Sequence, residues 1–325
     1  MPATGAVTFS DPGDYQAGFD GVTINVVLTG PGMFGAHLTS VDLSHTTLYS
    51  VQESLPHTAY VALPLETVNF TFSLSAPPPI WGGIEMKPGD LMFHSVGEHI
   101  HQRTRGAGRW GMISVDAEFF AQSTKALAGS AIVPPQVGQV LRPSGADMNE
   151  LQRLHAKACR LVETRPETVA HREIARAIEH EIIYALVECL KAKVVCGDTA
   201  ARRRCAAIMN RFEAALAANL DRQLPIATIC KSLSVPERTL RMCCRECLGT
   251  GPSRYIQLRR LNLVRDALRQ AGPATARVSD IAARYGYSEF GRFAASYRAI
   301  FGETPSATLR GARCKSHNPR LAVNA

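Results

Sequence analysis

A pattern of apolar residues that occurs twice in the last third of the chain constrains the fold most strongly. In the stretch from Leu224 to Gly249, the apolar positions have the spacing of a short helix, a tight turn at Leu233 to Val235, and a second helix. The stretch from Val278 to Gly302 repeats this spacing, so that Ile229 corresponds to Ile281. Each copy therefore predicts a helix-turn-helix unit.

A long helix is predicted between the two copies. Pro252 can occupy a first helical turn, and apolar positions at helical spacing continue from there to Leu268. A rigid helix of this kind can hold two other helices about one DNA turn, roughly 34 Å, apart along one side of a duplex. In the second copy, Ser279 is the expected cap of the first helix, and Gly286 is expected to supply the positive φ of the turn.

The charge of the chain is unevenly divided. Residues 200–325 carry a net charge of +14, whereas residues 1–199 carry −6, which together give the overall +8. Lysine and arginine side chains that neutralise phosphates release counterions, so a strongly basic region favours a polyanionic partner. A basic face that is merely solvated is the alternative explanation of the charge alone.

The same region resembles the AraC/XylS family of regulators. The resemblance covers residues 203–312 in order, and it is carried by Glu237-Arg238-Thr239-Leu240-Arg241, Pro252 to Leu268, Asp280-Ile281-Ala282, Tyr285-Gly286-Tyr287-Ser288 and Phe301-Gly302-Glu303-Thr304-Pro305-Ser306. It implies a DNA-binding transcription regulator, an activator as most relatives are, with no enzymatic activity and no cofactor. In two departures from the family pattern, Ser234 replaces the usual turn glycine and Pro236 replaces the usual Ser or Thr cap.

The resemblance and the helical spacing together assign roles to polar residues in the second helix of each unit. We expect base reading from Arg238, Thr239, Arg241, Glu289 and Arg292, and phosphate contacts from Arg245, Ser288 and Arg298. Arginine can donate two hydrogen bonds to guanine, but for each arginine a phosphate contact without sequence information is an equally open alternative. Gly291 and Ala295 stand where relatives often carry contacting side chains, which predicts fewer base contacts in the second unit.

The first part of the chain has the composition of an antiparallel β domain. Between Val22 and Val115, short runs rich in β-branched and aromatic residues alternate with turn formers, as in Thr23 to Leu28, Thr46 to Val51, Thr67 to Leu74 and Trp110 to Val115. Asp116 is the expected N-cap of a short helix that runs to Leu127. This pattern predicts an antiparallel β-barrel or a β-sandwich. Residues 1–145 are similar to the cupin-like sensor barrels that many members of this family carry, and the resemblance implies a barrel that senses a small-molecule effector of unknown identity and binding residues.

The pattern becomes helical after Asp147. Two antiparallel amphipathic helices are predicted within residues 146–197, the first opened by Asp147 and the second by Pro166. Their apolar stripes must be covered, which favours a linker that also mediates homodimerisation; packing of the stripes on the barrel is the alternative. The expected fold is α+β and multidomain: the barrel, the central helical pair, the all-α tandem helix-turn-helix domain and a flexible tail over residues 313–325.

The histidines and cysteines allow two further functional interpretations, a metal site and a thiol switch, and each has a simpler structural alternative. His94, His99 and His101 could hold a metal, which would suit a cupin-type metal-dependent oxygenase fused to a DNA-binding tail; ordinary polar histidines are the simpler interpretation, so we assign no metal site. Cys243, Cys244 and Cys247 could form a thiol switch, although cysteine also packs as a small hydrophobe. A DNA-repair methyl acceptor is excluded because residues 1–158 contain no cysteine.

The apolar runs predict a protein without a membrane segment. They are short and interrupted by charges, far below the roughly 20 residues that cross a bilayer, and the amino terminus lacks the features of a signal peptide. We therefore expect a cytoplasmic protein. Its expected partners are double-stranded promoter DNA, a small-molecule effector, RNA polymerase and a second copy of the chain.

Overall fold

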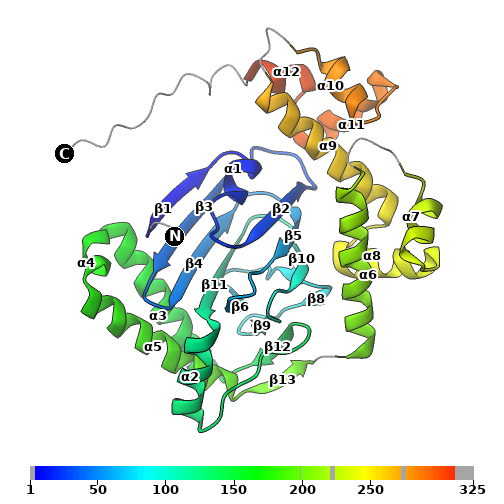
Figure 1. The fold of residues 1–325 in the computed structure, drawn as a ribbon. Helices are drawn as coiled ribbons and strands as arrows, with labels where there is room; N and C mark the ends of the chain where they lie inside the picture. Colours follow the sequence, from blue (N-terminus) through cyan, green and yellow to red (C-terminus); the bar gives the residue numbers. More distant parts are fainter. Residues whose placement is uncertain (1–3, 198, 220–223, 272–275, 312–325) are drawn as a thin grey trace.

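The amino-terminal part of the protein consists of two antiparallel β-sheets. The computed structural model describes residues 4–197, 199–219, 224–271 and 276–311, and the tail expected at residues 313–325 lies outside them. One sheet has the strand order β1-β3-β4-β11-β6-β9-β12-β13 and the other has the order β2-β5-β10-β7-β8 (Figure 1). Within the described residues no strand pairing joins the two sheets, so the barrel is not closed. The sheets instead enclose a common core, as in the sandwich that the sequence pattern also allowed.

Longer strands such as β6, with Val68, Phe70 and Phe72, follow the alternation of apolar and polar residues. Their bounds are β1 Gly5–Phe9, β2 Thr23–Leu28, β3 Ala36–Asp42, β4 Thr46–Glu53, β5 His57–Ala62, β6 Thr67–Ser73, β7 Ile80–Trp81, β8 Ile84–Glu85, β9 Leu91–Phe93, β10 His99–Arg103, β11 Gly108–Asp116, β12 Gln139–Arg142 and β13 Lys193–Cys196. A short helix, α1 (Pro12–Gln16), lies between β1 and β2. The four strands expected from the sequence are present, and β2 has the predicted bounds.

Helices cover the outer face of the larger sheet. They are α2 Ala117–Ala128, α3 Gly145–Thr164, α4 Pro166–Ala170 and α5 Arg172–Leu190. As predicted, the carboxylate of Asp116 caps α2 and accepts a hydrogen bond from the Phe119 amide at 2.9 Å. The capping residue of α3, however, is Ser144 and not Asp147. A helix begins at Pro166 as predicted, but it is interrupted at His171, so that the predicted second helix is divided into α4 and α5.

The apolar stripes of α3 and α5 pack on this sheet. Leu151 and Ile182 are fully buried in one cluster with Phe70 and Phe72 of β6, and the His155 ring nitrogen lies 3.0 Å from the Tyr49 carbonyl oxygen. The sequence left open whether a second copy of the chain or the β domain covers these stripes, and in the structure the sheet covers them. Burial lowers the pKa of His155 to about 4, so its neutral form is favoured in this core.

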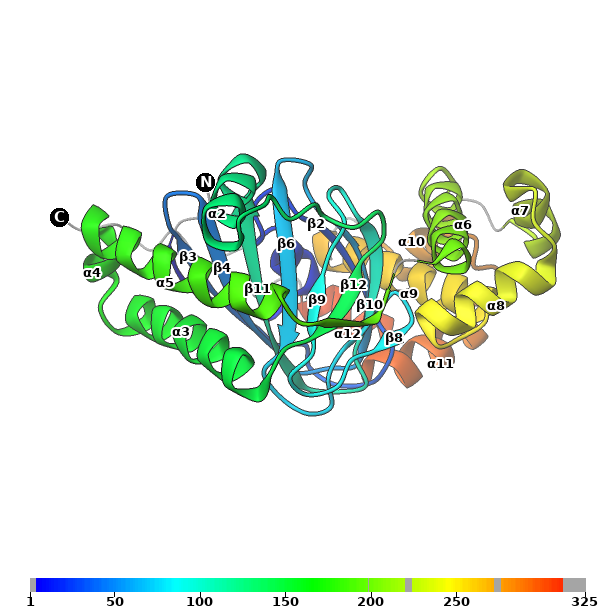
Figure 2. The same cartoon turned by 90° about the horizontal axis from the view of Figure 1, so that it is seen from below.

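The carboxy-terminal part is entirely helical. Its helices are α6 Ala200–Ala217, α7 Ile226–Leu233, α8 Glu237–Leu248, α9 Pro252–Gln270, α10 Val278–Arg284, α11 Phe290–Phe301 and α12 Pro305–Gly311. The helices α7 and α8 form the first predicted unit, α10 and α11 form the second, and α9 is the predicted long helix between them. In both views α6, α7 and α8 lie on the opposite side of the sheets from α3, α4 and α5 (Figures 1 and 2).

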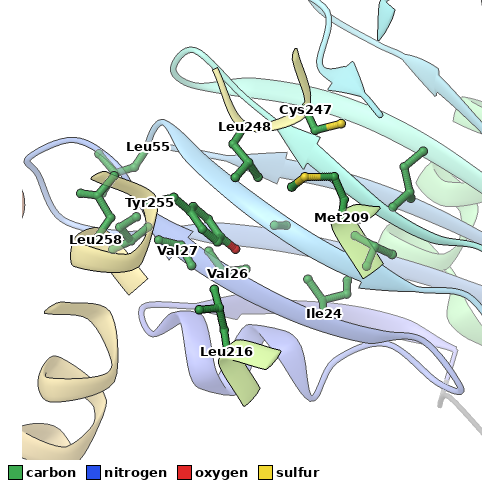
Figure 3. Packing of buried hydrophobic residues seen from close by; sticks show 14 of the residues in the cluster. Ile24, Val26, Val27, Leu55, Met209, Leu216, Cys247, Leu248, Tyr255 and Leu258 are labelled. Atoms are coloured by element: carbon green, nitrogen blue, oxygen red, sulfur yellow. The ribbon is translucent and has the colours of Figure 1, made fainter. Parts of the chain in front are cut away.

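The helical part packs directly on the smaller sheet. One hydrophobic cluster extends from the space between the sheets into the cores of both helix-turn-helix units. Figure 3 shows Leu216 of α6 and Tyr255 and Leu258 of α9 beside Val26 and Val27 of β2. The two parts are therefore joined by buried apolar surface as well as by the connecting chain. None of the described helices has the length and apolar content that a bilayer crossing requires.

Candidate nucleic-acid interface

The first helix-turn-helix unit is held together by a tight turn and a buried apolar face. Ser234 ends α7 in the left-handed region at φ 53°, the backbone conformation for which glycine is common in such turns. The Val235 amide then donates to the Cys230 carbonyl oxygen at 3.1 Å. Pro236 precedes α8 without a side-chain cap, and α8 nonetheless forms as expected. Both sequence departures are therefore accommodated by the local backbone.

The exposed side of α8 carries a stripe of arginines. Arg238, Arg241 and Arg245 are all exposed, whereas Thr239 is half-buried. These three arginines recur at intervals of three and four residues, so that they share one face of the helix. Arg241 forms an ion pair with Glu237, one turn earlier on the same helix. The buried side of α8 contacts α6 and β10, which leaves the arginine face directed to solvent.

One exposed residue on this face escaped the sequence predictions. Met242 is 59% exposed and lies between the positions of Arg238 and Arg245. Its exposure follows from the helical period, because it stands four residues after Arg238 and three before Arg245.

The second unit is positioned by Gly286 and Arg260. Gly286 has φ +76°, which confirms the expected turn conformation. The Arg260 guanidinium of α9 lies 4.5 Å from the centroid of the Tyr287 ring and donates from Nε to the Tyr285 carbonyl oxygen at 3.0 Å. Ser279 is not the cap that the sequence suggested, since it is the second residue of α10 and its hydroxyl contacts Asp280.

The exposed side of the second unit also carries polar residues. The Arg292 side chain is 86% exposed, and its guanidinium lies 3.0 Å from the Glu289 carboxylate one turn earlier. Arg298 is exposed further along α11, and Ser288 is exposed in the turn before the helix. The structure thus places Ser288, Glu289 and Arg292 together at the amino-terminal end of α11, with Arg298 in its last turn.

A continuous helix joins the two units. α9 has 19 residues, which corresponds to a length of about 28 Å at 1.5 Å per residue. Its early residues contact α8, and its Arg260 and Arg265 reach the second unit; the Arg265 guanidinium lies 4.9 Å from the centroid of the Phe301 ring. A rigid element therefore connects the helix that carries Arg238 with the helix that carries Arg292.

The cysteines of α8 face the protein interior. Cys243, Cys244 and Cys247 are all buried, and the Cys247 sulfur lies 3.9 Å from the sulfur of Cys205 in α6. A hydrogen bond with Cys205 and burial raise the pKa of Cys243 well above its ordinary value. Because the thiolate is the reactive form of cysteine, these surroundings favour a structural role.

The three histidines of the amino-terminal part do not converge. His94 bonds Glu98 at 2.8 Å, His99 contacts the Tyr60 hydroxyl at 3.0 Å, and His101 contacts Glu213 at 2.9 Å. Among the described residues, no three His, Cys, Asp or Glu side chains are arranged to bind a metal. The structure therefore gives no support to the alternative of a metal-dependent oxygenase.

Comparisons with known proteins match the carboxy-terminal part of the chain. A family of helix-turn-helix domains matches residues 229–311. The probable thc operon regulatory protein of Rhodococcus erythropolis is 36% identical over 95 residues, and the XylDLEGF operon transcriptional activator of Pseudomonas putida is 35% identical over 97 residues. These matches cover 29% and 30% of this chain and equal shares of the two relatives, so the chain spans about three tenths of their length.

Solved structures of similar proteins include the AraC-like transcriptional activator CuxR. It is 19% identical to this chain with a TM-score of 0.38, and the match covers 79% of this chain and 93% of CuxR. A probable AraC family transcriptional regulator from Rhodopseudomonas palustris is 28% identical over 32% of this chain and 96% of its own, with a TM-score of 0.30.

Proposed function

Residues 229–311 belong to the AraC/XylS-type helix-turn-helix family, and on this premise we propose that the protein is a sequence-specific, DNA-binding transcription regulator. The observation that carries the proposal is the pair of exposed polar faces, on α8 and α11, joined by the rigid helix α9. The net charge of +14 over residues 200–325 supports a polyanionic partner. No enzymatic activity is proposed.

We propose that double-stranded DNA is read through its major groove. In α8, Arg238, Thr239 and Arg241 are the proposed base-reading residues, with Arg245 on phosphate. In the second unit, Glu289 and Arg292 are the proposed base-reading residues, with Ser288 and Arg298 on phosphate. The exposure of all these side chains except the half-buried Thr239 supports the assignment, since base contacts require side chains that can enter the groove.

The proposed division of labour follows the domain order of the sequence. Residues 1–145 would form a cupin-like sensor of a small-molecule effector, residues 146–197 a linker and dimerisation region, and residues 203–312 the DNA-binding domain. The protein would act in the cytoplasm as an activator that contacts RNA polymerase. The two relatives named above, a probable operon regulatory protein and an operon transcriptional activator, support a role in transcription.

A homodimer is part of the proposal, but its surface differs from the stripe that the sequence indicated. That stripe packs on the larger sheet, so a second copy would have to use the outward side of α5. This side exposes Tyr184 by 57% and Ile174 by 37%. It also lies away from the DNA-binding helices, so a dimer formed there would leave both reading faces free (Figure 2).

Selection of bound fragments from random DNA, followed by fluorescence anisotropy with the enriched sequence, tests the proposed function. We expect the selected duplex to bind at least 10³-fold more tightly than a scrambled duplex, with affinity that falls steeply as salt rises. Equal affinity for both duplexes over the whole salt range would refute sequence-specific binding. A selection repeated with candidate metabolites identifies the effector.

A further inference from the structure

A short link rich in glycine joins α8, which carries the exposed arginines of the first unit, to the long helix α9. α8 ends at Leu248 and α9 begins at Pro252, so only Gly249, Thr250 and Gly251 lie between them. Glycine adopts more backbone conformations than any other residue. The residues of the link therefore do not by themselves fix the angle between the two helices.

Small changes of this angle matter for a protein that reads DNA with both α8 and α11. α9 has 19 residues, which gives it a length of about 28 Å. A rotation of about 10° at the link would displace the far end of α9, next to the second unit, by about 5 Å. This displacement exceeds the roughly 3.4 Å by which one base pair advances along a duplex. Groups outside the link must therefore hold the angle.

Arg103 of β10 packs on the link from the amino-terminal part of the protein. An added Cβ at Gly249 would lie 2.7 Å from the guanidinium carbon Cζ, which is closer than a real Cβ comes to a neighbouring atom, so the arginine fills the space beside this glycine. Gly249 is the C-cap of α8 and has φ 70°. The guanidinium thus lies at the carbonyl end of α8, where a positive charge is favourable.

The stability of the fold alone does not explain an arginine at this place. Its Nε is buried without a hydrogen-bond partner, and burial lowers the pKa of the guanidinium. A buried donor without a partner costs free energy. A methionine has a similar apolar stem and would fill much of the same space without that cost. The guanidinium of Arg103 therefore has a role beyond filling space.

The amino-terminal part also holds the other side of the link. Asn262 of α9 bonds both backbone groups of Leu28 in β2, at 2.9 and 3.2 Å. In the last turn of α9, Arg269 forms an ion pair with Asp11, which precedes α1. α9 is therefore fixed to the amino-terminal part at two places, and Arg103 fixes the end of α8 to the same part across the link.

We propose that Arg103 is a positioning residue for DNA binding, because its packing on Gly249 sets the angle between α8 and α9 and thereby the spacing of the two base-pair segments that the protein accepts. Arg103 acts through α8 and not through a contact with the duplex. The inference deepens the proposed regulator function and rests on it, since it adds to the two exposed polar faces the residue that sets their separation.

Duplexes with altered spacing test this proposal. The selected duplex should contain two blocks of enriched bases, one for α8 and one for α11. One base pair is inserted or removed between the blocks, and fluorescence anisotropy measures the affinity of the full chain for each duplex. We expect either change to weaken binding by the wild-type protein about tenfold or more, because one of the two helices then loses its base contacts.

Arg103→Met removes the guanidinium and retains an apolar stem. In this variant the loss of affinity on altered spacing should shrink to about threefold or less, while the affinity for the selected duplex falls by no more than about threefold. Arg153→Met is the matched control, since it removes an arginine of the amino-terminal part whose ion pair with Glu150 lies on α3. The control should keep the spacing penalty of the wild-type protein.

A second substitution at the link should reverse the effect of Arg103→Met. Gly251 has φ −77° and ψ 161°, and nothing lies within 4 Å of an added Cβ. Gly251→Ser therefore fits the existing backbone, reduces the conformational freedom of the link and supplies a side chain that can cap α9. In the Arg103→Met background it should restore about tenfold discrimination against altered spacing.

Two outcomes would overturn the proposal. If Arg103→Met weakened binding to all duplexes in the same proportion and kept the spacing penalty, the arginine would have only a structural role. If Gly251→Ser did not restore the penalty, the angle of the link would not be its cause. Arg103→Lys keeps a positive charge at the carbonyl end of α8 and should give an intermediate penalty, so it allows the same comparison if Arg103→Met does not fold.

The same titrations separate this inference from the proposed function. Equal binding of the selected and the scrambled duplex contradicts the regulator function. A wild-type protein that prefers the selected duplex but accepts an inserted base pair without loss of affinity contradicts the positioning role alone.

Discussion

His101 of β10 and Glu213 of α6 meet in a buried contact, with the histidine Nε2 2.9 Å from the carboxylate Oε1. The two residues are 112 positions apart and come from the sheet part and the helical part of the protein. The Tyr255 hydroxyl donates to the same oxygen at 2.6 Å, and Arg259 forms an ion pair with the other carboxylate oxygen. Burial alone would raise the pKa of Glu213, but the hydrogen bond from His101 and the positive charges of His101 and Arg259 hold it below its ordinary value.

Removal of the Glu213 carboxylate should loosen the contact between the two parts. Glu213→Ala leaves the buried His101 and Tyr255 and the half-buried Arg259 without their acceptor, which should lower the free energy of unfolding by about 3 kcal/mol or more. Glu213→Gln retains an acceptor oxygen and should lower the free energy of unfolding by less. Urea unfolding measures both. The control is Glu150→Ala, which breaks an exposed ion pair with Arg153 and should cause no measurable change; a similar effect of Glu213→Ala and Glu150→Ala would contradict the prediction.

Asn262 of α9 should be needed for docking of the helical part on β2. Its side-chain oxygen accepts from the Leu28 amide at 2.9 Å, and its nitrogen donates to the Leu28 carbonyl at 3.2 Å, so it takes the place of a neighbouring strand at the sheet edge. Asn262→Leu leaves both backbone groups buried and unpaired, which should cost about 2 to 4 kcal/mol of stability. Hydrogen exchange should then show faster exchange of the Leu28 amide, whereas Asn149→Leu on the exposed face of α3 should leave it protected.

Asp266 of α9 predicts a pH dependence of stability. Burial and the negative charge of Asp11 raise its pKa to about 7. A carboxyl group whose pKa is higher in the folded protein than in the unfolded chain contributes stability at low pH, and this contribution decreases as the pH rises to about 7. The temperature of the unfolding midpoint should therefore decrease as the pH rises from about 4 to about 7 and change little above that, and Asp266→Asn should reduce this decrease. An equally steep fall in the variant would show that other groups cause it.

Local features of the fold could be predicted from the sequence, and long-range ones could not. The bounds of β2 and the cap at Asp116 depend on neighbouring residues and were predicted correctly. The start of α3 was not, because two capping residues, Ser144 and Asp147, lie within the same turn and the first one caps the helix. Glu213 is an acidic residue in a basic region, and nothing nearby in the sequence signals its partner His101.

The same distinction applies to the candidate sites. The exposed arginines of α8 follow from the helical period and the repeat, so their placement could be predicted. The packing of Arg103 on Gly249 could not, because the two residues belong to different parts of the protein and nothing near either one in the sequence signals the other. His99 and His101 share one face of their strand as the period of two requires, but their partners come from other elements.

Two glycines of the second helix-turn-helix unit should respond in opposite ways to alanine. Gly286 has φ +76°, and an added Cβ would lie 3.0 Å from the Arg260 guanidinium, so Gly286→Ala should destabilise the unit by about 1 to 3 kcal/mol. Gly291 lies within α11 with nothing within 4 Å of an added Cβ, so Gly291→Ala should stabilise the helix by about 0.5 to 1 kcal/mol. Thermal unfolding measures both; stabilisation by Gly286→Ala would contradict the role of its backbone conformation.

Arginines at different positions of the reading faces should have different effects on DNA binding. Arg238→Ala and Arg292→Ala should each reduce the preference for the selected base at one position by about 1 to 3 kcal/mol, because a guanidinium near the start of the helix can reach base edges. Arg298→Ala should weaken all sequences alike and reduce the salt dependence, as expected for loss of a phosphate contact. Competition anisotropy with single-base variants of the selected duplex separates these outcomes. The matched control is Arg153→Ala, since Arg153 also pairs with a glutamate three residues earlier but lies on α3. If Arg238→Ala and Arg292→Ala weakened every duplex equally, both arginines would be phosphate contacts, and base recognition would have to come from the other exposed residues of α8 and α11.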